Sequence, residues 1–273
     1  PGCEVVCFAL DAAHPAFVEH LGSGGRGVYA QDGMVMLANG DHRIPVVEAR
    51  RLPFTLNGCA RFNMENALAA IAALLALGIA RDRIAAELAS FTSNAQQNPL
   101  RMNLFCAHGV TLLVDYAHNA SAYRAIAETG RQLANGRVIG VAAAPGDRRD
   151  DDLHEIGRVC REGFDELVFY EMDEVRDRPL GATAARLDEG ARRVPGRAAP
   201  RIVLDVRHAI REAFLAARPG DALVLGCASH LDDVKEALAG LADIASVNMG
   251  EMAQEDASDA APHLTEEAVG ADA

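Results

Sequence analysis

Short apolar runs and helix-like segments alternate from residue 100 onward, and this alternation constrains the fold more than any other feature of the chain. The apolar runs lie at 110–114, 138–142, 167–170, 202–206 and 222–225. Segments with helical spacing separate or follow them, at roughly 121–134, 152–162, 181–193, 207–217 and 230–242. Strands that alternate with helices in this way form a mostly parallel sheet covered on both faces. We therefore predict an α/β fold for this part of the chain.

The first 57 residues have a different pattern, in which short apolar runs flank turn signals. Asp32-Gly33 and Asn39-Gly40 each lie between such runs, which favours two-residue hairpin turns. We predict a β-meander that is too small for a core of its own, so it packs on the next segment of the chain or completes a larger sheet. A further apolar run covers residues 3–8, and we interpret the start at Pro1 as a cut.

Residues 61–91 change to helical periodicity, with a break at Gly78. This spacing predicts two helices joined by a short turn, the second of which Asp82 can cap. A polar segment, 92–98, precedes Pro99 and predicts a linker. We expect three regions: 1–98, 99–245, and a tail of 246–273 whose acidic, Ala-rich composition predicts disorder.

Two polar clusters follow predicted strands directly. Asp115-Tyr116-Ala117-His118-Asn119 follows the run at 110–114, and Gly146-Asp147-Arg148-Arg149-Asp150 comes shortly after the run at 138–142. Ligands of open α/β sheets bind at the carboxyl ends of the strands, so both clusters belong on the ligand edge. A polar helix entrance, capped by Asn119 or Ser121, and a solvated loop are the plainer alternatives.

Composition excludes several classes of function. A net charge of -13 argues against nucleic acid as a partner, because phosphate backbones need clustered Lys and Arg. No apolar run approaches the roughly 18 residues of a membrane span, and the amino terminus has no signal-like segment, so we expect a soluble, cytoplasmic protein. The six cysteines show no metal-ligand spacing, and most of them are interpreted as small core side chains. Neither a G-x-x-x-x-G-K-[ST] phosphate loop nor a dehydrogenase-type G-x-G-x-x-G after the first strand occurs.

Three stretches together resemble the C-terminal half of the Mur ligase superfamily, most closely its cyanophycin synthetase branch. They are RFNMENALAA at 61–70, DYAHN at 115–119 and PGDRRD at 145–150. The resemblance covers about residues 3–245. It implies a Rossmann-like C-terminal domain, preceded by the end of a central ATP-binding domain that would supply the meander and the helix pair.

The resemblance also implies a set of binding residues. Nucleotide contacts are expected from Asn63 and Asn66 at the adenine, from Asp115 at the ribose, from Arg101 near the ribose and phosphates, and from His118 at a phosphate. Asn119 is expected in the same nucleotide site. The amino-acid side of the cleft is expected to use Gly146, Asp147, Arg148, Arg149, Arg176 and Arg178. Helix capping by Asn63 and Asn66, and a merely solvated Arg101, are the alternatives that the residues themselves leave open.

The sequence departs from the family pattern at several positions. Phe62 replaces a His, Leu100 replaces the Gly of Pro-Gly-Arg, and Ala120 replaces a Pro. In the segment that corresponds to R-G-R-x-x-G-E, Asp177 replaces a Gly and Ala182 replaces the Glu. These changes put the turn at Leu100 and substrate binding at 176–182 in doubt.

The implied chemistry is a ligation in which ATP phosphorylates a carboxylate and an amine then attacks the acyl phosphate. In the resembling branch, arginine is joined to a poly-aspartate backbone with Mg²⁺ as the metal. The phosphate loop, the metal ligands and a modified lysine would all lie upstream of Pro1, in a missing region or a partner chain. The alternative is a module that binds a nucleotide or amino acid without turnover. A homo-oligomer is compatible with either function.

Overall fold

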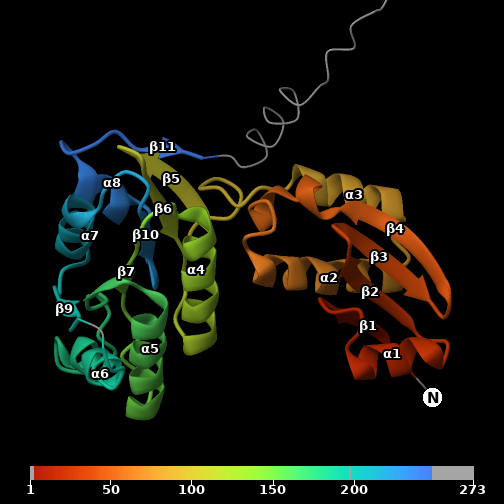
Figure 1. Cartoon of the computed structure of the whole chain (residues 1–273), viewed down its shortest axis with the longest axis horizontal. Coiled ribbons are helices and arrows are strands. Elements are labelled where there is room, and N and C mark those ends of the chain that lie inside the picture. Colours follow the sequence, from red (N-terminus) through yellow and green to blue (C-terminus); the bar gives the residue numbers. More distant parts are fainter. Residues whose placement is uncertain (1–2, 197, 248–273) are drawn as a thin grey trace, which may run out of the picture.

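The structure is a computed structural model that describes residues 3–196 and 198–247. It contains two sheets, each with its own helices, and the segment between α3 and β5 joins them (Figure 1). The first sheet has the strand order β1-β2-β3-β4, and the second has the order β11-β5-β6-β10-β7-β8-β9. An α/β architecture with a mostly parallel second sheet is thus confirmed.

The first sheet combines a meander with one parallel pair. Its strands are β1 Val6–Ala9, β2 Arg26–Gln31, β3 Met34–Asn39 and β4 His42–Glu48. The predicted meander is confirmed, because β2, β3 and β4 pair antiparallel. The helix α1, Pro15–Gly22, was not predicted, and it connects β1 to β2 in parallel.

The two hairpin turns differ in how well they were predicted. Asp32 and Gly33 both have positive φ, 50° and 74°, as a type I′ turn requires. The second loop is Gly40-Asp41 rather than Asn39-Gly40, because Asn39 still pairs with His42. Gly40 has φ 55°, the conformation that glycine adopts most easily at the first central position.

Two short 3₁₀ turns, Ala49–Arg51 and Pro53–Thr55, lead to helices α2, Arg61–Ala76, and α3, Arg81–Ser90. The predicted helix pair is therefore confirmed, with the turn at Gly78, φ 78°. The predicted cap was wrong: Ala80 is the N-cap of α3, and Asp82 bonds Arg81 instead. The helices and the first sheet share one apolar core that includes Val28, Leu68 and Ile84.

The second sheet contains all five predicted strands, four of them close to the expected bounds. Its strands are β5 Asn103–Ala107, β6 Val110–Val114, β7 Val138–Ala142, β8 Glu166–Phe169, β9 Arg201–Ile202, β10 Ala222–Leu225 and β11 Ala245–Ser246. The run at 202–206 gives only a short strand, because Asp205 accepts a bond from the His208 amide (2.8 Å) and begins a helix. Antiparallel β5 and β11 were not predicted.

Five helices cover this sheet. They are α4 Ala120–Leu133, α5 Asp150–Gly163, α6 Ala182–Ala191, α7 Val206–Ala216 and α8 Asp232–Leu238. Side chains of α4, α5 and α6 form one apolar cluster, and those of α7 and α8 form another, in which different residues of the same strands take part. The alternation of strand side chains therefore puts three helices on one face and two on the other.

Contacts also connect the two sheets outside the linker. Leu56 and Ala60 are buried in the cluster that α4 and α5 form on the second sheet. The Thr129 hydroxyl of α4 donates to the Cys59 carbonyl (3.3 Å). Residues 56–60, which precede α2, thus hold its beginning beside α4.

Several predictions concern other parts of the chain. Of the six cysteines, only Cys160 and Cys227 are buried, so the core interpretation was wrong for Cys3, which is exposed. The predicted tail begins at Ser246, which lies in β11, and its remainder, 248–273, lies outside the described residues. Among the described helices, none combines the length and apolar character that a bilayer span needs.

Candidate functional site

A hollow of about 570 Å³ lies where α2, the linker and the carboxyl end of β6 meet. Side chains from all three segments line it. The six residues predicted for nucleotide binding are all among them: Asn63, Asn66, Arg101, Asp115, His118 and Asn119. Its size is typical of a site for a small organic ligand. The structure thus brings together residues that are up to 56 positions apart in the sequence, from Asn63 to Asn119.

Asp115 is the buried acid of the hollow. It follows β6 directly, its side chain is 6% exposed, and one carboxylate oxygen accepts a hydrogen bond from the Met102 amide (3.1 Å). Burial raises the pKa of this carboxyl from 3.8 to about 6, although the Met102 amide and Arg101 oppose the shift. The carboxylate is therefore costly in the ligand-free protein, and further hydrogen-bond donors would stabilise it.

His118 and Asn119 stand at the beginning of α4. Asn119 is the N-cap, and its side-chain oxygen accepts a bond from the Ala122 amide (2.9 Å), as the capping alternative predicted. Its amide nitrogen is left for a ligand. His118 Nδ1 lies 2.9 Å from the Tyr116 carbonyl, to which it can only donate. A neutral His118 therefore presents Nε2 as an acceptor, and it can donate to a phosphate oxygen only when protonated.

Asn63 and Asn66 lie within the first two turns of α2 and do not cap it, because the N-cap is Ala60. Asn63 donates to the Phe54 carbonyl (2.7 Å), which fixes its side chain, while Asn66 is exposed to the hollow. Phe62, one of the divergent positions, is half-buried, lines the same hollow and packs against the α4 side of the second core. The aromatic ring thus fills space between the two sheets.

Arg101 lies in a linker with unusual backbone geometry. Leu100 and Met102, on either side of it, have φ of 60° and 53°. Left-handed conformations of this kind cost non-glycine residues about 1 kcal/mol each. Leu100, which stands where the family pattern has a glycine, thus adopts a backbone conformation that glycine accepts most easily. The Arg101 guanidinium lies 5.1 Å from the centre of the Tyr116 ring, at cation–π distance.

Most charged side chains of the second predicted cluster, at residues 146–150, form ion pairs with neighbouring residues of the chain. Arg176 bonds Asp147 (2.8 Å), and Arg149 bonds Asp152 (2.8 Å). Arg176 holds the pKa of Asp147 below its ordinary value. Arg178 binds the carbonyls of Gly146 and Arg148 and the carboxylate of Asp150. The loop after β7 and the segment 176–178 are thus brought together, but mainly by contacts with each other.

Two members of this cluster have distinct roles. A Cβ on Gly146 would lie 2.1 Å from the Val175 carbonyl oxygen, so the close approach of the two segments requires glycine. Arg148 has a buried Nε without a partner among the described residues. It lines a second hollow, of about 400 Å³, together with His118, Asn119 and Ser121. These last three also line the first hollow, so the two hollows adjoin.

The hollow also contains residues that we did not predict. Asn98, Tyr116 and Ser121 line it in addition to the predicted set. Tyr116 and Ser121 lie in or beside the cluster at 115–119, so that motif was the available signal. Asn98 lies in the linker, and nothing in its sequence surroundings distinguishes it from a solvated polar residue.

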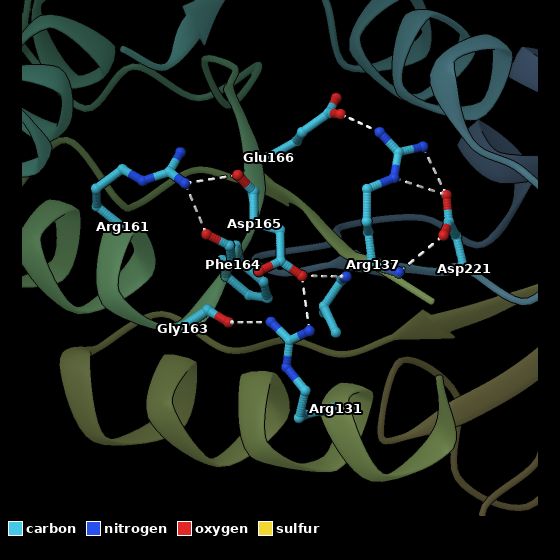
Figure 2. Close-up of polar contacts among 9 residues, drawn as sticks. Arg131, Arg137, Arg161, Gly163, Phe164, Asp165, Glu166 and Asp221 are labelled. Atoms are coloured by element: carbon cyan, nitrogen blue, oxygen red, sulfur yellow. Dashed lines mark hydrogen bonds and ion pairs between the residues drawn. The ribbon is translucent and has the colours of Figure 1, made fainter. Parts of the chain in front are cut away.

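The opposite, amino-terminal edge of the second sheet also contains many charged residues, but they form a closed network (Figure 2). Asp221 accepts from the Arg137 amide (2.8 Å) and the Arg137 guanidinium (2.7 Å), and Arg137 also pairs with Glu166. Arg131 bonds Asp165 (2.7 Å), whose carboxylate accepts the Val138 amide as well (2.8 Å). These groups join the starts of β7, β8 and β10.

The described residues contain no cluster of three or more His, Cys, Asp or Glu side chains that fits a metal ion. The hollow, in contrast, has the donors and acceptors that fit an adenine nucleotide. A buried carboxylate suits hydroxyl donors, two carboxamides suit a base edge, and Arg101 with the beginning of α4 suits anionic groups.

Comparison with known proteins identifies relatives over most of the chain. Residues 100–230 match the family described as "Mur ligase, glutamate ligase domain". Cyanophycin synthetase of Trichormus variabilis is 35% identical over 222 residues, which are 81% of this chain and 24% of that protein. The UDP-N-acetylmuramoyl-L-alanyl-D-glutamate–2,6-diaminopimelate ligase of Gloeobacter violaceus is 32% identical over 76% of this chain and 41% of its own length. The chain thus spans about a quarter of the cyanophycin synthetase.

Solved structures show the same fold. The folylpolyglutamate synthase of Mycobacterium tuberculosis complexed with ADP has a TM-score of 0.56 and 19% identity, over 79% of this chain and 48% of that one. A murein peptide ligase from Psychrobacter arcticus has a TM-score of 0.54 and 17% identity, over 86% of this chain and 46% of that one. At these identities the likeness concerns the fold.

Proposed function

Because residues 100–230 belong to the Mur ligase family, we propose that the chain is the C-terminal part of an ATP-dependent amino-acid ligase similar to cyanophycin synthetase. The amino acid we propose is arginine, and the acceptor is a side-chain carboxylate of a poly-aspartate chain. One observation carries this proposal: side chains with the chemistry of a nucleotide site come from α2, the linker and the end of β6 to line one hollow.

ATP would supply the phosphoryl group that activates the acceptor carboxylate. Asp115 accepts hydrogen bonds from the ribose hydroxyls, and Asn63 and Asn66 lie at the adenine. Arg101 and the beginning of α4, with His118 and Asn119, lie toward the phosphates. Two observations support these roles: Asp115 is buried with few hydrogen bonds, and residues at the beginning of α4 line the same hollow.

The second hollow is our proposed place for the incoming amino acid. Arg148 is the cation available there, since its Nε has no partner among the described residues. Gly146, Asp147, Arg149, Arg176 and Arg178 shape the loop around it and stay as predicted substrate-side residues. An amino acid at Arg148 would lie next to His118, which both hollows share. Such proximity is what joining an amine to an activated carboxylate requires.

Catalysis would need groups that this chain does not contain. Its sequence has no phosphate loop, and its described residues offer no metal site, so we assign Mg²⁺ no ligand here. We propose that a P-loop region or a partner chain supplies both. The edge of the first sheet supports such a neighbour: within the described part, β1 pairs with β2 alone, and Val5 (58%) and Phe8 (49%) are exposed.

Calorimetric titration with ADP tests the nucleotide site. We expect saturable binding by the full chain and a loss of about tenfold or more in affinity for Asp115→Ala, with folding intact. Asp177→Ala is the matched control, because Asp177 is exposed and lines neither hollow. Equal affinity for Asp115→Ala and the wild type would remove Asp115 from the site.

A second candidate function is ligand binding without turnover. The self-pairing of Arg149, Arg176 and Arg178 favours it, because these side chains are engaged in the ligand-free chain. The native size of the polypeptide in its source cells separates the candidates. A much larger chain supports the ligase and calls for an assay of ATP-dependent arginine ligation on the whole protein. A chain near 28.9 kDa supports binding alone or a separate partner.

A further inference from the structure

We propose that Asn103 is a positioning residue that holds the linker in place and thereby sets Arg101 and Asn98 at the hollow. This inference rests on the proposed nucleotide site for its functional consequence, but the linker clamp itself is independent of any ligand. Asn103 is the first residue of β5 and is 1% exposed. It is not among the residues that line the hollow.

All hydrogen bonds of the Asn103 side chain go to the main chain of the linker. Its oxygen accepts from the Leu100 amide (2.8 Å). Its nitrogen lies within bonding distance of three carbonyls, those of Ser93 (3.2 Å), Asn98 (3.0 Å) and Arg101 (3.2 Å). One buried carboxamide therefore ties together both ends of the segment 93–101, which a solvated linker residue would not do.

The linker conformation needs such support. Leu100 and Met102 are both left-handed, at φ 60° and 53°, so the unsupported segment would relax to other conformations. Two further bonds join the same segment to the end of β6: the Tyr116 amide donates to the Leu100 carbonyl (2.9 Å), and the Met102 amide donates to Asp115. Asn103 itself pairs with Val114 in β6, so the clamp is anchored on the sheet.

The geometry links this clamp to the site. Asn98 and Arg101 line the hollow while their carbonyls bond Asn103. The Arg101 guanidinium then lies over Tyr116, whose own amide is bonded to the linker. Loss of the carboxamide would therefore free Arg101 without removing any atom from the hollow.

Trypsin reports on the clamp directly, because Arg101 is the only Lys or Arg between Arg83 and Arg124. In Asn103→Leu, which keeps the shape but not the hydrogen bonds, we expect cleavage after Arg101 to be about tenfold faster than in the wild type. Asn103→Ser is the milder variant if the first folds poorly. Asp221→Asn, at the other edge of the sheet, is the control for general destabilisation. Unchanged cleavage after Arg101, or equal acceleration at all sites as in the control, would overturn the clamp.

A double-mutant cycle with ADP affinity tests the consequence for the site. We expect about tenfold weaker binding for Asn103→Leu and for Arg101→Ala, and no additional loss when both are combined, because Asn103 acts through Arg101. Additive losses of about a hundredfold would contradict this route. If the wild type itself binds no ADP, the proposed function fails, and the trypsin result still decides on the clamp.

Discussion

Asp115 and Asp221 are buried to nearly the same extent, at 6% and 4% exposure, at opposite edges of one sheet. Asp115 follows β6, and burial raises its pKa to about 6 although hydrogen bonds from the Met102 and Ala117 amides oppose the shift. Burial acts in the same direction on Asp221, but hydrogen bonds from Arg137 and the Arg218 amide outweigh it and lower the pKa. At Asp115 desolvation outweighs the hydrogen bonds, whereas at Asp221 the more numerous hydrogen bonds outweigh desolvation.

This contrast separates polar groups that stabilise the fold from polar groups that can still bind a ligand. At the amino edge each carboxylate of the Arg131, Arg137, Asp165 and Asp221 network is bonded within the chain, so its charge supports the fold (Figure 2). At the carboxyl edge, the buried Asp115 accepts few hydrogen bonds. The Arg148 Nε has no partner among the described residues. A ligand can complete the second set, whereas it could only disrupt the first.

Asp221→Asn should give the largest change. Removal of the charge leaves the Arg137 guanidinium without its buried partner, and we expect the free energy of unfolding to fall by about 3 kcal/mol at pH 7. Urea denaturation measures this. Because the folded pKa is lowered, the loss should shrink as the pH falls below about 4, where the carboxyl of the unfolded wild type becomes protonated before that of the folded protein. ADP affinity should be unchanged, and a weakened affinity would break the distinction between the two edges.

Asp115→Asn should change the free energy of unfolding in the opposite direction. The wild-type carboxyl has a raised folded pKa of about 6, so its ionised form destabilises the folded state above that pH. We expect the variant to be more stable by about 2 kcal/mol at pH 7 to 8, with the gain disappearing between pH 6 and pH 4. Thermal unfolding across this range measures it. A variant that is less stable at pH 8 would show that the carboxylate supports the fold as Asp221 does.

Arg178→Ala tests the contacts between the loop after β7 and the segment 176–178. Arg178 binds the carbonyls of Gly146 and Arg148, so its removal should destabilise the protein by about 1.5 kcal/mol in urea denaturation. Arg176→Ala is the matched control, because it removes an exposed ion pair with Asp147, and its effect should be smaller. Equal effects would mean that the loop is not held by the carbonyl contacts.

Asp177→Gly should have the smallest effect. Asp177 has φ 66° where glycine is most easily accommodated, and we expect a gain of about 0.5 kcal/mol in the free energy of unfolding. Asp177→Ala keeps the Cβ and should show no gain. If both variants are equally stable, backbone strain at this position is negligible.

The parts of the fold that could be predicted are those where local sequence and tertiary structure agree. Fully apolar runs such as 110–114 and 138–142 became strands with the expected bounds, because parallel strands are buried on both faces. The strand β5 was missed because its first residue, Asn103, is polar and is buried only through contacts with the linker. The helix α1 was missed because the hairpin signals around it dominated.

The candidate site shows the same limit. Motifs identified six of the residues that line the hollow, because such residues carry the recognisable chemistry. They gave no sign that Arg176 and Arg178 would pair with a carboxylate and with carbonyls of the loop after β7, since those contacts join segments about 30 residues apart. The sequence also did not show that Leu100 and Asp177, which stand where the family pattern has glycines, both adopt a left-handed backbone.

Hydrogen–deuterium exchange of the full chain, with and without saturating ADP, tests the central claim most directly. If the hollow at the carboxyl edge is the nucleotide site, peptides that cover 61–66, 98–102 and 115–122 should become protected, and those around Arg137, Asp165 and Asp221 should not change. Protection confined to the amino edge, or none at any of the three segments, would contradict it.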